Sequence, residues 1–86
     1  MFTQKMIDQA QTKLWVKWKY PNNGYEKMVF YSFENRMSIQ SGDLTFGASG
    51  LLKMLEKELK GKYEVAILYD KRTGAPIKKF IDGIEV

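Results

Sequence analysis

Two tryptophans and three lysines lie within eight residues near the start of the chain, in the segment KLWVKWKY at 13–20. Rings and ammonium groups together suit single-stranded nucleic acid, because bases stack on aromatic rings while ammonium groups bind phosphates. In a β-strand, side chains alternate between two faces, so Trp15 would lie among the lysines and Trp18 would lie opposite them. We therefore expect Trp18 in the core and Trp15 at a binding surface.

The expected binding residues form two groups. One is an aromatic and basic sheet face made of Lys13, Trp15, Lys17, Lys19 and Phe30. The other is a basic hairpin that carries Lys71, Arg72, Lys78 and Lys79. Hairpin tips are solvated and edge lysines discourage aggregation, so the second group also has a purely structural explanation. The net charge of +4 suits an anionic partner without requiring one.

The inventory of reactive side chains is narrow. The chain has no Cys and no His, which excludes thiolate and imidazole catalysis and the usual zinc sites. The segment GASGL at 47–51 lacks the second glycine of a nucleophile elbow, and no Gly-Lys-Ser or Gly-Lys-Thr phosphate loop occurs. We expect a protein that is not an enzyme, with no catalytic residue, metal or cofactor.

The residues that follow the first segment predict a β-hairpin. Asn23-Gly24 favours a tight turn, and YEKMVFYSF at 25–33 would return as the second strand. Closing the chain at this turn places Trp18 opposite Val29. In that register Val29, Tyr31 and Phe33 share the aliphatic face with Leu14, Val16 and Trp18, whereas Met28, Phe30 and Ser32 share the face of Trp15.

The remaining elements complete an α+β pattern. Residues 3–12 predict a short helix capped by Thr3, and 34–50 predict mainly a loop. Leucines at helical spacing in 51–60 predict a helix, with Ser49 as its N-cap. Residues 62–70 and 75–81 predict a second hairpin. We expect residues 1–86 to form a single domain of order α-β-β-loop-α-β-β, an antiparallel sheet of two hairpins with helices packed on it.

Three explanations of the Trp15 face stay open. The N-terminal helix could fold across it and bury it, the face could bind nucleic acid, or it could bind protein. Nucleic-acid binding is the leading expectation. The alternative is a protein-interaction module, either a homodimer or a small inhibitor of a larger complex, of the kind that mobile genetic elements encode.

The sequence gives no sign of a membrane protein. Its longest apolar run is VAILY at 65–69, far short of the roughly 20 residues that a membrane-spanning helix needs. The N-terminal segment MFTQKMIDQAQ carries polar residues where a signal peptide would be apolar. We expect an intracellular, cytoplasmic protein.

Overall fold

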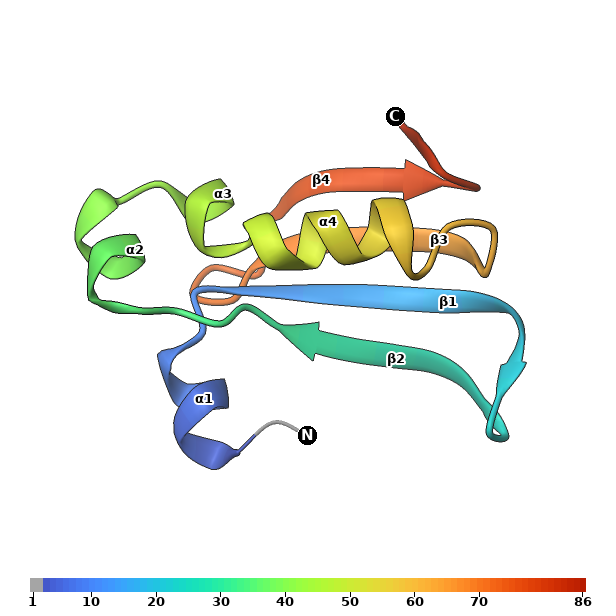
Figure 1. Cartoon of the computed structure of the whole chain (residues 1–86), viewed down its shortest axis with the longest axis horizontal. Coiled ribbons are helices and arrows are strands. Elements are labelled where there is room, and N and C mark those ends of the chain that lie inside the picture. The colour runs from blue at the N-terminus through green and yellow to red at the C-terminus, as the bar shows by residue number, and fades with distance from the viewer. Residues whose placement is uncertain (1–2) are drawn as a thin grey trace.

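The computed structural model describes residues 3–86, in which helices and an antiparallel sheet form an α+β arrangement (Figure 1). Its sheet has five strands, all paired antiparallel in the order β2-β1-β3-β4-β5. The strands are β1 (Thr12–Asn22), β2 (Tyr25–Tyr31), β3 (Tyr63–Asp70), β4 (Pro76–Ile81) and β5 (Ile84–Glu85). The predicted α+β class and its antiparallel hairpins are confirmed.

Helix α4 (Ser49–Lys57) packs on one face of the sheet and closes the core. Its Leu51 and Leu55 are buried against β1 and β3, because the leucine spacing in this segment turns one side of the helix toward the sheet. The buried core consists of Leu14, Val16, Trp18, Ala48, Leu51, Leu55, Tyr63, Ala66 and Leu68. Trp18 is only 6% exposed, as expected. Ser49 is not the N-cap: the cap position is Ala48, which makes no side-chain hydrogen bond.

The segment predicted as a loop contains two short helices, α2 (Arg36–Ser41) and α3 (Leu44–Gly47). Asn35 caps α2 in a reciprocal capping box with Ser38, and Asp43 caps α3 by accepting from the backbone N–H of Thr45 at 3.0 Å. These polar caps, rather than any apolar period, set both helix starts. The prediction of a loop was therefore wrong at these two places.

The register of the first hairpin differs from the predicted one. Asn22 does face Tyr25 across the Asn23-Gly24 turn, where both residues have positive φ angles of 52° and 83°. Further along, however, Lys17 faces Lys27, because the register shifts between Lys17 and Asn22. The irregularity contains Pro21, which has no N–H to donate to a ladder.

The shift of register exchanges the two faces of β2. An odd shift moves every side chain of a strand to the opposite face. Phe30 therefore faces Leu14 and packs on the core, with its ring at 88° to that of Trp18 and 6.5 Å between centroids. Val29 faces Trp15 instead. The prediction that Phe30 shares the face of Trp15 was wrong.

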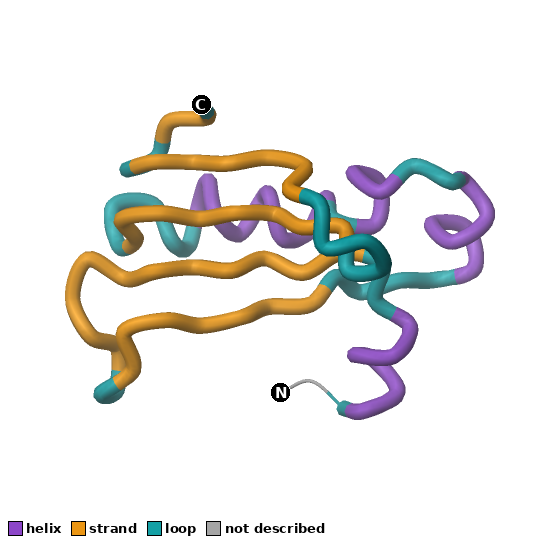
Figure 2. The backbone as a smooth tube through the Cα atoms, turned by 180° about the vertical axis from the view of Figure 1, so that it is seen from behind, coloured by secondary structure: helices purple, strands orange, loops and turns teal. Residues whose placement is uncertain are grey.

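The N-terminal helix does not bury Trp15. Helix α1 (Gln4–Gln9) is capped by Thr3, whose hydroxyl accepts from the backbone N–H of Met6 at 3.2 Å, as predicted. None of its residues is buried, and it lies beyond the end of the strands (Figures 1 and 2). Within residues 3–86, no helix lies over the sheet face opposite α4 (Figure 2). None of the described helices is long and apolar enough to span a membrane.

Candidate functional site

The sheet face opposite α4 is the candidate site, and we call it the open face. Strand pairing places three rows of side chains on it. The central row runs across four strands through Val29, Trp15, Ile67 and Lys79, with the row Tyr31, Lys13, Tyr69 on one side and the row Lys27, Lys17, Val65, Ile81 on the other. The open face thus combines aromatic, aliphatic and basic side chains.

Trp15 occupies the centre of the open face. It is half-buried between Val29 and Ile67, its partners on the two neighbouring strands. Beside it is a shallow groove of about 380 Å³, lined by Lys13, Trp15, Val29, Ile67, Tyr69 and Gly74. The groove brings the Trp15 and Tyr69 rings to one surface, with aliphatic side chains as its floor.

Each of these two rings has an ammonium group nearby. Lys27 Nζ lies 6.0 Å from the centroid of the Trp15 ring, and Lys13 Nζ lies 5.8 Å from that of Tyr69. Cations at this distance are attracted by the negative face of an aromatic ring. The rings and the positive charges are therefore interleaved rather than separated.

The open face also holds an electrostatically unfavourable pair. Lys17 and Lys27 are direct cross-strand partners, and like charges in that position destabilise a sheet. Lys17 has a carboxylate within reach, since its Nζ lies 3.4 Å from Glu64 Oε2. Both of these groups are substantially exposed, so the ion pair is weak.

Lys19, another expected site residue, is not in any of the three paired rows of the open face. It follows the register shift and forms an ion pair with Asp82, which lies in the turn between β4 and β5. The hydrogen bond from Lys19 to the Asp82 carboxylate raises the pKa of the lysine above its ordinary value. Lys19 therefore links β1 to the turn between β4 and β5 at one end of the sheet.

The second basic cluster is dispersed in the structure. Lys71 Nζ donates to the carbonyl oxygen of Ile7 at 2.6 Å and so holds the end of α1. Arg72 contacts the carboxylate of Asp70, and Lys78 Nζ lies 3.3 Å from Glu85 Oε2. Only Lys79 among these residues shares a row of the open face, next to Ile67.

Seven side chains of the open face were not predicted as site residues: Lys27, Val29, Tyr31, Val65, Ile67, Tyr69 and Ile81. Lys27 and Tyr31 were missed because the register shift in the first hairpin places them on the face opposite to the predicted one. Ile67 and Tyr69 alternate with buried Ala66 and Leu68 in β3, so the sequence could have predicted that they share a face. The sequence could not predict that β1 lies beside β3.

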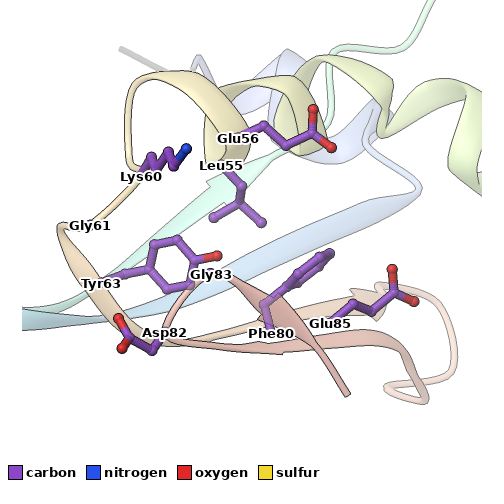
Figure 3. Close-up of a pocket in the computed structure, with 9 residues that line it drawn as sticks. All are labelled: Leu55, Glu56, Lys60, Gly61, Tyr63, Phe80, Asp82, Gly83 and Glu85. Atoms are coloured by element: carbon purple, nitrogen blue, oxygen red, sulfur yellow. The ribbon is translucent and has the colours of Figure 1, made fainter.

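A larger pocket of about 560 Å³ lies on the other side of the sheet, between α4 and the turn from β4 to β5 (Figure 3). Leu55 projects toward the rings of Tyr63 and Phe80, while Glu56 lies at the rim (Figure 3). Burial raises the pKa of the Tyr63 hydroxyl, so the group stays neutral well above pH 7. The pocket offers an apolar floor, and its carboxylates Asp82 and Glu85 already have lysine partners.

Among residues 3–86, no three Asp or Glu side chains are grouped so that they could hold a metal ion. The chain matches no protein-family model, and no curated protein or solved structure is significantly similar to it. The function therefore has to be inferred from the residues and geometry of the open face.

Proposed function

We propose that the protein is a non-enzymatic module that binds single-stranded nucleic acid on its open face. The observation that carries this proposal is the position of Trp15 at the centre of a sheet face that none of the described helices covers, beside Tyr69 and surrounded by lysines. Trp15 and Tyr69 lie on neighbouring strands one row apart, about 8 Å between Cα atoms from standard strand spacings. Two such rings can each take one base.

The charges of the open face support the same function. Lys13 and Lys17 lie on β1, Lys27 on β2 and Lys79 on β4, so the lysines surround the rings instead of forming a patch apart from them. The opposed lysines 17 and 27 repel each other in the free protein. A phosphate between them would remove that repulsion, which an uncharged ligand would not.

A titration with labelled oligonucleotides tests the proposal. Fluorescence anisotropy is measured with a single strand and with the matching duplex, at 50 and 200 mM salt. If the four lysines of the open face neutralise phosphates, single-strand affinity falls about 50-fold between these concentrations, from a slope of about 0.7 per phosphate contact. Absence of binding at 50 mM salt would contradict the proposal, and so would binding that does not depend on salt.

Matched variants separate the open face from general charge. Trp15→Ala is expected to weaken single-strand binding by about tenfold or more, because stacking on one ring contributes roughly 1 to 3 kcal/mol. Tyr20→Ala is the control, since Tyr20 is 81% exposed and lies outside the open face. Lys71→Ala is expected to have little effect, because the ammonium group of Lys71 is engaged with α1. Equal losses in all three variants would show that binding does not depend on the Trp15 ring.

A protein-interaction module remains the second candidate. It is favoured by exposed apolar side chains away from the open face, among them Phe33 at 70% and Met37 at 71% exposure. Aromatic and methionine side chains are enriched in the centres of protein interfaces. For a homodimer, light scattering would give twice the mass of the chain. A monomeric mass over the working concentration range would exclude that form.

A further inference from the structure

The outer edge of β2 at Lys27 and Val29 is a second surface, next to the open face. Among the described strands, β2 stands at one end of the sheet order and pairs with β1. The backbone N–H of Ser32 donates to the carbonyl of Thr12 at 3.1 Å, which makes these two a hydrogen-bonded pair. Such pairs alternate along an antiparallel ladder, so Phe30 and Met28 also point their backbone groups toward β1. Lys27 and Val29 consequently direct theirs outward.

The usual protections of a sheet edge are weak along β2. Natural edge strands are blocked by proline, by bulges, by dense charge or by a covering element. β2 contains no proline, and its register with β1 is regular from Lys27 to Tyr31. Its Met28 and Val29 are 44% and 37% exposed. The edge can therefore pair with an added strand.

An apolar groove lies at the C-terminal end of this edge, on the side of the sheet that carries α4. Its volume is about 350 Å³, and its lining includes Phe30, Phe33, Phe46 and Met54. Phe33 is 70% and Phe46 48% exposed, so the groove is open to solvent. Phe30 belongs both to β2 and to the groove. A strand added to β2 would thus bring every second side chain toward an apolar surface.

The charges of the neighbouring open face decide which kind of strand fits. Lys27 lies on β2 itself, with Lys13 and Lys17 on the adjacent strand. A second copy of the chain, with its own net charge of +4, would bring the same lysines to the same side of an enlarged sheet. A strand with acidic side chains on that side would complement them.

We propose that the β2 edge takes up an extended strand from another protein. The strand carries acidic side chains on the side of the open face and large apolar side chains on the other, one of which enters the Phe33 and Phe46 groove. Backbone hydrogen bonds to Lys27 and Val29 hold the strand, and the alternating side chains select it. This surface shares Lys27 and its neighbouring lysines with the open face, but it does not depend on nucleic-acid binding, because it uses the edge and the groove rather than the Trp15 ring.

The probe is a synthetic peptide of seven alternating Glu and Leu residues with blocked ends. A peptide of the same composition, with its glutamates and leucines in separate blocks, is the control. Amide NMR should show slower hydrogen exchange at Lys27 and Val29 with the alternating peptide, and affinity at least about tenfold higher than for the control. Equal affinity for both peptides, or unchanged exchange at these two amides, would overturn the proposal.

Variants test the edge and the groove separately. Phe46→Ala should weaken peptide binding several-fold, whereas Ile39→Ala should not, because Ile39 is 49% exposed but does not line the groove. Val29→Pro removes an outward N–H without removing a bond to β1, so it should also weaken binding. Trp15→Ala should leave peptide affinity within about twofold, which separates this result from the nucleic-acid titration. Equal effects of Phe46→Ala and Ile39→Ala would contradict the proposal, and so would a dimer that forms without peptide and is disrupted by Phe46→Ala.

Discussion

The carboxylate of Glu34 is held inside the protein by donors from three segments of the chain. Ser38 Oγ donates to it at 2.7 Å, Ser32 Oγ also donates, and the backbone N–H of Gln11 lies at 3.4 Å. Gly47 lies directly against the same carboxylate, where a Cβ atom would overlap both oxygens. At the scale of single residues, this contact joins the α2 and α3 segment to the start of β1.

Gly47→Ala should therefore destabilise the fold. The Glu34 side chain would have to move and give up hydrogen bonds to the two serines, which costs about 1 to 3 kcal/mol of unfolding free energy. Gly50→Ala is the matched control in α4, where nothing lies within 4 Å of an added Cβ and helix propensity predicts a gain of up to about 1 kcal/mol. Urea unfolding measures both. Equal free energies of unfolding for the two variants would show that the Glu34 side chain can move without destabilising the fold.

A second residue-scale prediction concerns pH. The backbone N–H of Arg72 donates to Asp70 Oδ1 at 2.9 Å and, with the guanidinium group, lowers the pKa of Asp70 below its ordinary value of 3.8. A carboxyl whose pKa is lower in the folded state stabilises the fold above its unfolded pKa, and this contribution disappears as pH falls through the folded pKa.

Asp70→Asn should consequently lower the unfolding midpoint in urea at pH 6 and have a much smaller effect near pH 2. The pH range of the change lies below about pH 4, since both the ordinary and the lowered pKa lie there. Midpoints measured at several pH values for the wild type and the variant give the comparison. A difference that stays constant from pH 6 to pH 2 would mean that ionisation of Asp70 is not the cause.

At the scale of elements, the irregularity in β1 determines which side chains of β2 reach the core. Phe30→Ala should cost about 2 kcal/mol, because a half-buried ring in contact with Trp18 is lost. Val29→Ala on the open face should cost less than about 1 kcal/mol. The register expected from the turn alone gives the opposite order. Thermal or urea unfolding of the two variants distinguishes the two registers.

Much of the element pattern could be predicted because it is local. Asn23-Gly24 defines its turn, the leucines of α4 repeat at helical spacing, and Thr3 caps α1. The face of β2 could not be predicted, since the irregularity between Lys17 and Asn22 is a feature of strand pairing and not of the turn sequence. Helices α2 and α3 are too short for a clear apolar period.

The same distinction applies to the candidate site. Trp15, Lys13 and Lys17 were predicted from alternation within one strand, and the structure places them on a common face. Phe30 was wrongly placed there, and Lys27 and Tyr69 were missed. These three depend on register and strand order, which arise from long-range pairing rather than from neighbours in the sequence.

At the scale of the whole molecule, the sheet has one covered and one open side. A chain of this size buries only about 60% of the surface that it exposes when unfolded. Here α4 closes the core on one side of the sheet, and none of the other described helices lies over the opposite side. The other side carries the half-buried rings of Trp15, Tyr31 and Tyr69 together with the partly exposed Val29 and Ile81. The two tryptophans lie on the two sides, Trp18 in the core and Trp15 on the open face.

The most direct measurement uses the indole N–H signals of these two tryptophans in a ¹⁵N-labelled sample titrated with single-stranded oligonucleotide. Trp15 should shift progressively and saturate together with the amides of Lys13 and Tyr69. Trp18 should hardly change, because it is 6% exposed and lies under α4. Shifts confined to the Lys71 and Arg72 turn, or a spectrum that does not respond at 50 mM salt, would contradict nucleic-acid binding by the open face.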